Sequence, residues 1–125
     1  MTILPRDPDA SAARLQAALT ARSGVAVAVI VSDTFGRPWR DGVVNVALGV
    51  ARLRPLLDYR GQRDSFGRLL QSTVIAIADE IAGAAELVMG KTAGTPVVVV
   101  RGAGEWAGDG TGAMLLRPPS MDLFR

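Results

Sequence analysis

Residues 25–34 read Val25-Ala26-Val27-Ala28-Val29-Ile30-Val31-Ser32-Asp33-Thr34. We expect a strand at Val25–Val31, because a continuous, mostly β-branched apolar run is typical of a strand that is covered on both faces. The run ends at Ser32-Asp33-Thr34, which places a carboxylate between two hydroxyls. Because ligands of α/β sheets usually bind beyond the carboxyl ends of the strands, this tripeptide is the first candidate site.

Helix signals lie on both sides of this strand. Upstream, Asp7 is a typical helix cap, Pro8 suits the first helical position and Gly24 suits the end. Downstream, apolar residues recur at helical spacing from Thr73, which is able to cap a helix, to Gly90, which is able to close it. The sequence therefore predicts two main helices.

Further strand signals complete the expected fold. Val43–Val50 predicts a second strand, and residues 51–59 either extend it or form a short strand at an edge. Four consecutive valines in Thr95–Arg101 predict another buried strand. The sum is a single domain, residues 1–125, of the α+β or α/β class, in which the two helices pack on a mixed sheet of about four to five strands.

Glycine dominates the end of the chain. Residues 102–113 predict a flexible glycine-rich loop, and residues 118–125 predict an extended C-terminal arm. The loop follows an expected strand, as a phosphate-binding loop does. It lacks the Gly-Lys-Ser/Thr motif, however, and no helix signal follows it, so a connector is the better interpretation.

The composition narrows the chemistry. The chain contains no cysteine and no histidine, which excludes disulfides, thiol nucleophiles and imidazole bases and leaves oxygen ligands for any metal. The net charge is +2 without a basic stripe, which argues against nucleic acid as a partner. The longest apolar run is too short for a membrane span and the N-terminus does not read as a signal peptide, so we expect a cytoplasmic protein.

Asp33 and Thr34 are candidate metal ligands. A carboxylate and a hydroxyl at the end of a strand suit Mg²⁺ or Mn²⁺ that bridges the phosphates of a nucleotide. The alternative, which the chemistry alone favours, is a turn cap in which both side chains satisfy backbone donors close by in the sequence.

Arginines cluster after this tripeptide. Arg37 and Arg40 flank Trp39, an arrangement that suits an anionic substrate with a flat ring. The alternative is a surface loop anchored by a buried Trp39, with both arginines in solvent. Arg60 follows Asp58 in a second motif, where anion binding competes with a local ion pair. Arg37, Arg40 and Arg60 are therefore candidates for binding an anionic substrate.

The second expected helix ends in Met89-Gly90-Lys91, and Lys91 is the only lysine of the chain. A cation here is able to hold a phosphate, but a cation at a helix C-terminus is also ordinary stabilisation. Asp79 and Glu80 in the same helix suggest a second metal or base site, against the alternative of a polar stripe. We assign no catalytic residue from the sequence.

Several long motifs occur in order along the chain: Leu4-Pro5, Asp7-Pro8-Asp9, Ser32 to Gly42, Pro55 to Gly61, Asp64 to Arg68, Ala78 to Lys91, Pro96 to Gly102, and Leu116-Arg117-Pro118 followed by Asp122-Leu123-Phe124. Together they resemble the coenzyme F420-0:L-glutamate (gamma-glutamyl) ligase family. The resemblance runs from about Ile3 to the C-terminus and corresponds to the C-terminal half of the family's ligase region.

The resemblance implies a ligase of coenzyme F420 biosynthesis. GTP, as co-substrate, would phosphorylate a carboxylate of the F420 precursor to an acyl phosphate, which the amine of L-glutamate attacks to form an amide. Mg²⁺ or Mn²⁺ would clamp the phosphates. By this resemblance, Asp33 and Thr34 match metal-ligating positions, and Met89, Gly90 and Lys91 match a nucleotide-contacting segment.

The resemblance also bears on partners. The family's N-terminal half carries a further metal-ligating aspartate and part of the GTP site, so we expect a homodimer or a partner chain that supplies this half. Val43 and Val44 stand where the family has glutamine and a small polar residue, and Lys91 is a glutamine in some members. The alternative function is therefore a truncated, non-catalytic anion- or nucleotide-binding module, or a subunit that needs a partner chain.

Overall fold

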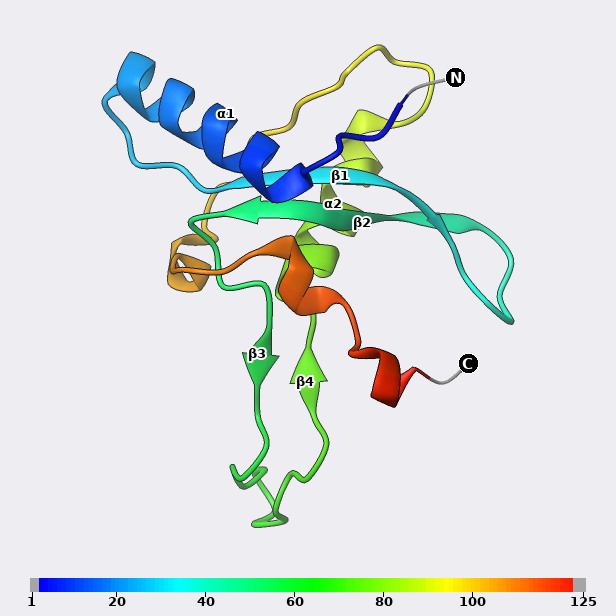
Figure 1. Ribbon diagram of the computed structural model, residues 1–125. Helices are drawn as coiled ribbons and strands as arrows, with labels where there is room; N and C mark the ends of the chain where they lie inside the picture. The colour runs from blue at the N-terminus through cyan, green and yellow to red at the C-terminus, as the bar shows by residue number, and fades with distance from the viewer. Residues whose placement is uncertain (1–2, 123–125) are drawn as a thin grey trace.

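The computed structural model describes residues 3–122 and folds as an α+β domain (Figure 1). Its elements are α1 (Pro8–Ser23), β1 (Val29–Gly36), β2 (Val43–Ala51), β3 (Leu57–Asp58), β4 (Val74–Ile75), α2 (Ile77–Met89) and three 3₁₀ helices, η1 (Gly104–Trp106), η2 (Gly112–Leu115) and η3 (Pro119–Met121). β1 pairs with β2 and β3 pairs with β4, both antiparallel. The α+β class and the two main helices are confirmed, whereas each sheet is smaller than the single mixed sheet that we expected.

α1 forms where the sequence predicts it. The carboxylate of Asp7 accepts a hydrogen bond from the backbone N–H of Ala10 at 2.8 Å, and Pro8 is the first helical residue. Gly24 ends the helix with a φ of 70°, a left-handed conformation in which its N–H donates to the carbonyl of Thr20. Cap chemistry that is local in the sequence therefore determines both ends of this helix.

β1 begins later and runs further than the strand that we expected. Its register with β2 starts at the pair Val29 and Ala51, and the strand continues to Gly36. The predicted strand at Val25–Val31 is therefore wrong at both ends, and Ser32-Asp33-Thr34 lie inside β1 instead of beyond its end. The reason is that a strand extends as far as its partner pairs with it, and β2 pairs only with residues 29–36.

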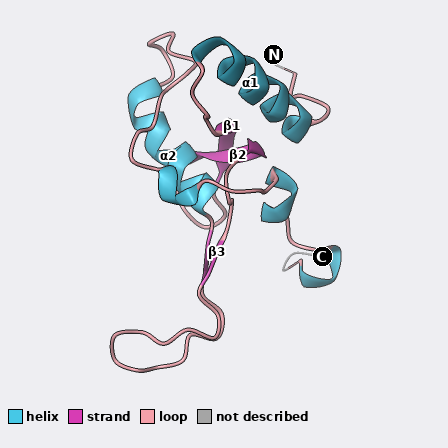
Figure 2. Cartoon of the chain, turned by 90° about the vertical axis from the view of Figure 1, so that its left-hand side faces the viewer, coloured by secondary structure: helices cyan, strands magenta, loops and turns pink. Residues whose placement is uncertain are grey.

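β3 and β4 form the base of a hairpin arm that projects from the rest of the domain (Figures 1 and 2). Leu57–Asp58 pairs with Val74–Ile75. This pairing keeps the chain extended after Thr73, so the predicted helix cap at Thr73 is wrong and α2 begins at Ile77. Gly90 ends α2, as the sequence predicts.

The valines before residue 101 do not form a strand. Within the described part of the chain, Thr95–Arg101 has no strand pairing, so the predicted buried strand is wrong. Val97 and Val99 are 75% and 72% exposed. β-branched residues favour a strand only where a neighbour pairs with their backbone, and residues 3–122 provide no such neighbour here.

The glycine-rich segment that follows packs against the end of β2. Residues 102–113 contain η1 and the first residues of η2, and Ala107 forms an isolated β-bridge with Leu53. The flexibility of this segment stays a prediction. In the C-terminal arm that we expected at 118–125, η3 forms, and residues 123–125 lie outside the described residues.

The core is small and centred on β2. Ala47, Val50, Leu53 and Ala78 are buried together in it. α1 and α2 lie on either side of the β1–β2 hairpin, and both contact β2 (Figure 2). The position of β2 therefore decides where both helices sit.

None of the helices in residues 3–122 is both long and apolar enough to cross a membrane. This finding does not test where the protein is located. The cytoplasmic location that we expect from the sequence stays a prediction.

The carboxylate of Asp9 connects three segments of the fold. Asp9 lies in the first turn of α1, and its Oδ1 accepts hydrogen bonds from the backbone N–H groups of Val50 at 2.8 Å and Gly112 at 2.6 Å. Its Oδ2 accepts from the N–H of Ala113 at 3.3 Å. Burial alone would raise the pKa of Asp9, but these three donors stabilise the anion and hold its pKa below the ordinary value.

Gly49 allows the first turn of α1 to approach β2. A Cβ at this position would lie 2.1 Å from the carbonyl oxygen of Pro8, well inside van der Waals contact. The hairpin also has a β-bulge here, because the register shifts between Val31 and Ser32 and leaves Leu48 without a partner. The close contact between helix and strand therefore requires glycine at this position.

We predict that Asp9→Asn lowers the free energy of unfolding by about 2 kcal/mol, because three backbone donors lose a charged acceptor. Asp7→Asn is the matched control, since it removes a charge from the same helix end while asparagine caps helices as well as aspartate does. Urea unfolding followed by circular dichroism measures both variants. An Asp9→Asn loss no larger than that of Asp7→Asn would contradict the role of Asp9.

The stabilisation that the Asp9 carboxylate provides should depend on pH. The pKa of Asp9 in the folded protein lies below its ordinary value of 3.8. The stabilisation by its carboxylate is therefore fully present above that value and is lost as the pH falls through the folded pKa. The stability difference between wild type and Asp9→Asn should narrow as the pH falls below 3.8.

We predict that Gly49→Ala destabilises the domain by about 3 kcal/mol, because the new methyl group meets backbone atoms that have no room to move. Gly36→Ala is the control, since a Cβ at Gly36 meets no atom within 4 Å. Thermal unfolding of the two variants makes the comparison. Equal midpoints would show that α1 does not pack on β2 as described.

Candidate functional site

Four polar side chains meet where β1, β2 and the end of α2 come together. Thr34 and Asn45 are paired across the hairpin. The ammonium of Lys91 donates to the hydroxyl of Thr34 at 2.5 Å and to the amide oxygen of Asn45 at 3.3 Å. It also forms an ion pair of 2.5 Å with the carboxylate of Glu86. We call these four residues the Lys91 cluster.

The cluster is closed on the protein side and open on the solvent side. Asn45 is only 6% exposed. The side chain of Glu86 is 18% exposed, whereas that of Lys91 is 54% exposed. Asn45 and Glu86 are therefore held in place by packing, while Thr34 and the ammonium of Lys91 are accessible to a ligand.

Asp33 does not join this cluster. Consecutive residues of a strand point to opposite faces, so the carboxylate of Asp33 and the hydroxyl of Thr34 lie on different faces of β1. Oδ1 of Asp33 accepts a hydrogen bond from the backbone N–H of Thr34 at 2.7 Å, and the residue is exposed. Among residues 3–122, no group of three or more acidic, histidine or cysteine side chains is placed to hold a metal. The side chains of Asp33 and Thr34 thus lie on different faces of β1, and metal binding by these two residues stays a prediction.

An open hollow of about 300 Å³ lies at the end of α2. It is lined by Met89, Gly90, Lys91, Gly94, Thr95 and Pro96. Its volume lies at the lower end of the range for small-molecule sites, roughly 300–1,000 Å³. The segment expected to contact a nucleotide, Met89–Lys91, therefore forms one wall of a hollow that the Lys91 cluster borders.

The loop between β1 and β2 carries Arg37, Trp39 and Arg40. Trp39 is 92% exposed, so the alternative of a loop anchored by a buried Trp39 is wrong. Its φ of 67° is uncommon for a bulky residue. The guanidinium of Arg37 donates to the carbonyl of Asp41, and its Nε is buried without a partner among residues 3–122. Arg40 is exposed.

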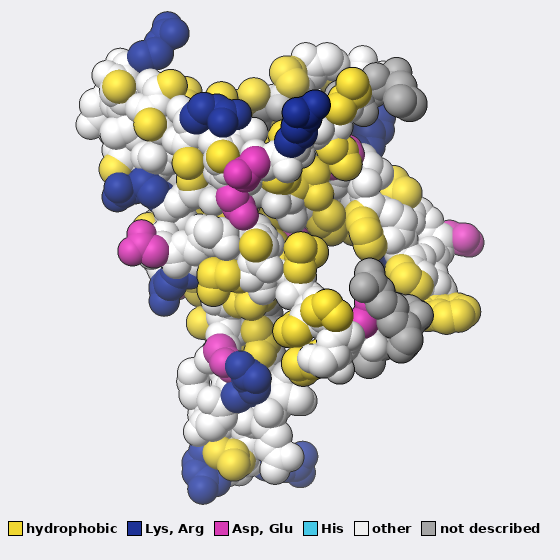
Figure 3. Space-filling view, in the orientation of Figure 1, with side chains coloured by type: hydrophobic (Ala, Val, Ile, Leu, Met, Phe, Trp, Pro, Cys, Tyr) yellow, Lys and Arg dark blue, Asp and Glu magenta, His cyan; other side chains and the backbone are white. Residues whose placement is uncertain are grey.

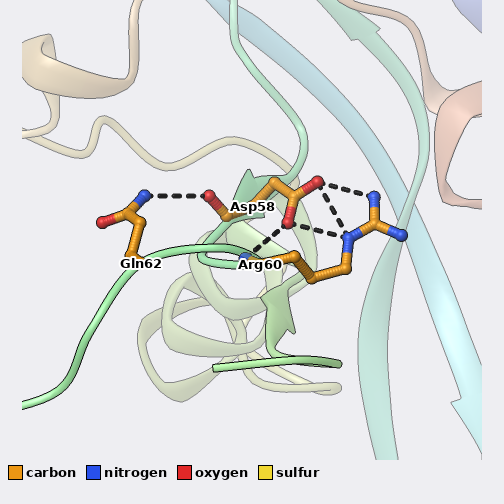
Figure 4. Close-up of polar contacts among 3 residues, drawn as sticks. All are labelled: Asp58, Arg60 and Gln62. Carbon is orange, nitrogen blue, oxygen red and sulfur yellow. Dashed lines mark hydrogen bonds and ion pairs between the residues drawn. The ribbon is translucent and has the colours of Figure 1, made fainter. Parts of the chain in front are cut away.

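Arg60 pairs with Asp58 on the hairpin arm (Figure 4). Its Nε donates to the two carboxylate oxygens at 2.9 Å and 3.0 Å, its Nη2 donates at 2.6 Å, and its backbone N–H donates at 2.9 Å. The side-chain bonds, followed by the backbone bond, lower the pKa of Asp58 to about 2, and the same contacts raise the pKa of Arg60. Arg60 thus forms the local ion pair that was the alternative, and anion binding by Arg60 stays a prediction.

Two polar residues near the site have roles that sequence reasoning did not assign. Asn45 was missed, although a single polar side chain in the apolar strand Val43–Ala51 indicates a buried hydrogen-bonding partner. Asp79, considered above as a metal or base residue, accepts a hydrogen bond from the backbone N–H of Ala47 at 2.9 Å. It therefore fastens α2 to β2.

The fold and the site define a class of domain. It is an α+β domain centred on the antiparallel β1–β2 hairpin, with polar and charged side chains gathered where that hairpin meets the end of α2. The sequence profile of F420-0:Gamma-glutamyl ligase matches residues 1–102. The chain belongs to the F420-0:gamma-glutamyl ligase family.

Curated relatives named coenzyme F420:L-glutamate ligase align with almost the whole chain. The relative from Methanothermobacter thermautotrophicus is 50% identical, across 99% of this chain and 50% of its own. The relative from Methanocaldococcus jannaschii is 46% identical, across 98% of this chain and 50% of its own. The relative from Methanopyrus kandleri is 46% identical, across 98% of this chain and 51% of its own. The chain thus spans about half the length of the curated relatives it matches.

We predict that Arg60→Gln raises the pKa of Asp58 from about 2 toward its ordinary value of 3.8, because the charged donor is lost. Arg63→Gln is the control, since the guanidinium of Arg63 donates to the carbonyl of Gly67 and not to Asp58. Carboxyl ¹³C NMR during a pH titration measures the pKa in each variant. The same low pKa in Arg60→Gln would contradict the ion pair.

Proposed function

We propose that the chain contributes the C-terminal half of the ligase region of a coenzyme F420:L-glutamate ligase. Its family membership supports this reaction class, since similar proteins of about twice its length carry that name. The structural observation that carries the proposal is the junction at Lys91. This side chain lines the hollow and reaches Thr34, the residue next to Asp33.

The proposed reaction is GTP-dependent amide ligation. A carboxylate oxygen of the F420 precursor attacks the γ-phosphorus of GTP, GDP leaves, and an acyl phosphate forms. The amine of L-glutamate, after losing a proton, attacks the carbonyl carbon. The bond from that carbon to the phosphate oxygen breaks, and inorganic phosphate leaves with the electron pair. Phosphoryl transfer of this kind depends mainly on positioning and on charge neutralisation.

A divalent cation, Mg²⁺ or Mn²⁺, belongs to this proposal. Such an ion, when bound, neutralises phosphate charge and acts as a Lewis acid. The exposed carboxylate of Asp33 fits a hard cation of this type. The hydroxyl of Thr34 accepts one hydrogen bond, from Lys91, and keeps a second lone pair, so it remains a candidate ligand for the cation.

The remaining candidate residues suit the other ligands. Met89–Lys91 walls the hollow, and the half-exposed ammonium of Lys91 stands at its edge, where a phosphate of GTP would meet a positive charge. Arg37 and Arg40 flank the exposed ring of Trp39. We propose that this loop contacts an anionic substrate with a flat ring, as the F420 precursor is.

The apolar surface of the chain supports a protein partner. Leu87, Val97 and Val99 are large apolar residues that are exposed, and hydrophobic side chains spread over the visible face in Figure 3. Side chains of this kind are available for contact with another protein. We propose that the other half of the ligase region covers them, supplied by a partner chain or within a homodimer.

A second candidate function is a non-catalytic module, or subunit, that binds an anion or a nucleotide. The observation that favours it is the pair Val43 and Val44 at the start of β2, beside the arginine-bearing loop. The family resemblance leads us to expect polar side chains at these positions. A chain with apolar side chains at these two positions would bind its ligand without catalysing a reaction.

We predict that the folded chain binds GTP in the presence of Mn²⁺ and that Asp33→Ala weakens this binding at least about tenfold, roughly 1.4 kcal/mol. Isothermal titration calorimetry of the purified chain measures the affinity. Asp41→Ala is the matched control, because it removes an exposed carboxylate from the adjacent loop.

Two outcomes separate the candidate functions. If the folded wild-type chain does not bind GTP, its nucleotide site is incomplete. The chain would then act as a subunit that needs a partner chain to bind the nucleotide. If it binds, a ligase assay follows in which the N-terminal half of the Methanothermobacter thermautotrophicus relative is added. Amide formation in that mixture identifies an enzyme half, and binding without amide formation identifies a non-catalytic module.

A further inference from the structure

A second hollow lies where η2 packs beside β2. It has a volume of about 240 Å³, and Asp79 is the only charged residue that lines it. Apolar side chains make up most of the remaining wall: Phe35, Val46, Leu48, Leu115 and Leu116. It shares no residue with the hollow at the end of α2 or with the Lys91 cluster. We call it the Asp79 hollow.

Two parts of the fold supply the apolar wall. Phe35, Val46 and Leu48 lie on the same face of the β1–β2 hairpin, because side chains alternate along a strand and cross-strand partners share a face. Leu115 is the last residue of η2 and packs against the core, whereas Leu116 is 76% exposed. The hollow therefore has a wall that is fixed by packing and one leucine at its rim that is open to solvent.

Asp79 supplies a hydrogen-bond acceptor in this apolar wall. Its Oδ1 accepts the backbone N–H of Ala47 at 2.9 Å, which fixes the carboxylate beside β2. Among residues 3–122, its Oδ2 accepts no hydrogen bond and forms no ion pair. Because a carboxylate accepts several hydrogen bonds, Asp79 is able to receive one more, from a donor in the hollow.

This lining determines what kind of ligand fits. Apolar walls that include the half-exposed ring of Phe35 favour a flat ring, and the carboxylate favours a ring that carries an N–H donor. Asp79 would repel a phosphate or a carboxylate. The volume is below the roughly 300–1,000 Å³ of sites that hold a whole small molecule. The hollow therefore suits the ring of a ligand whose charged part lies elsewhere.

The charged part of such a ligand has a place nearby. Phe35 precedes Arg37 by two residues, so the wall of the hollow leads directly into the arginine-bearing loop between β1 and β2. Arg40 of that loop is exposed. A molecule with a flat ring at one end and an anionic group at the other would thus meet an apolar wall and then a positive charge.

We propose that the Asp79 hollow seats the flat ring of the F420 precursor, and that an imide N–H of the ring donates to the carboxylate of Asp79. This proposal rests on the proposed function, because the ligase reaction is what supplies a deazaflavin ring with such an N–H. Asp79 then has two roles. It fastens α2 to β2 through one oxygen and binds the ring through the other.

The test is binding of 5-deazariboflavin, followed by its fluorescence, with neither GTP nor metal present. The folded wild-type chain should bind it, and should bind the N3-methyl derivative at least about tenfold more weakly, because the methyl group removes the donor that faces Asp79. Equal affinity for the two probes, or no binding by the folded chain, would overturn the proposal.

Variants locate the ring in the hollow. Leu116→Asp should weaken binding of 5-deazariboflavin at least about tenfold, because it places a charge at the apolar rim. Leu87→Asp is the matched control and should bind as wild type does, since Leu87 is 89% exposed and lies outside the lining. An unchanged affinity in Leu116→Asp would contradict the location.

Asp79→Asn tests the hydrogen bond itself. The amide oxygen of asparagine is able to keep the bond from Ala47, whereas its NH₂ group cannot accept from the ring. The variant should therefore lose most of the difference between the two probes, and urea unfolding checks that it is folded. A full difference in folded Asp79→Asn would count against Asp79.

Failure of this proposal is distinguishable from failure of the proposed function. Titration with GTP and Mn²⁺ does not involve the ring, and titration with 5-deazariboflavin involves no nucleotide. GTP binding without ring binding would leave the ligase reaction and remove the ring from this hollow. Ring binding without GTP binding would leave the hollow as the ring site of a non-catalytic module.

Discussion

The carboxylate of Asp9 is the contact on which the arrangement of the domain depends. It accepts backbone N–H groups from β2 and from η2 while it belongs to α1, so one charged group joins the two ends of the chain to its central strand. The junction works only because Gly49 has no side chain and lets the backbone of α1 reach β2. A partly buried carboxylate without these donors would be costly, whereas the three donors stabilise its ionised form.

The contacts that hold β2 in place also determine where the residues of the candidate site lie. Asp79 of α2 accepts the N–H of Ala47, so a second helix carboxylate holds the same strand from the other helix. With β2 fixed between the helices, Asn45 is buried facing the end of α2, and its cross-strand neighbour Thr34 is carried to the same place. Lys91 meets both because α2 stops at Gly90. The contacts that fix the fold and those of the candidate site therefore involve the same strand, β2.

The domain exposes many of its large apolar side chains. Its core is small, with few large side chains fully buried, and Val97 and Val99 face solvent in a segment that forms no strand within the described residues. The chain spans about half the length of its curated relatives. A partner of the kind proposed above would cover these exposed apolar side chains.

The sequence by itself determined what depends on neighbours along the chain. The cap at Asp7 and Pro8, the helix ends at Gly24 and Gly90, the strand β2 and the family followed from motifs, because caps, turns and periodicity act over a few residues. Asp33 and Lys91 were recognised as candidates in the same way.

Only the tertiary structure decided what depends on partners far away in the sequence. The extent of β1, the loop at Thr95–Arg101 and the start of α2 follow from which strands pair and where that pairing stops. The side chain of Thr34 contacts Lys91, whereas the side chain of Asp33 lies on the other face of β1. Both facts follow from the register of the β1–β2 hairpin and from the position of α2 beside it. The physical reason is that a strand or a polar cluster is stable only when its partners satisfy it, and no local motif encodes where those partners lie.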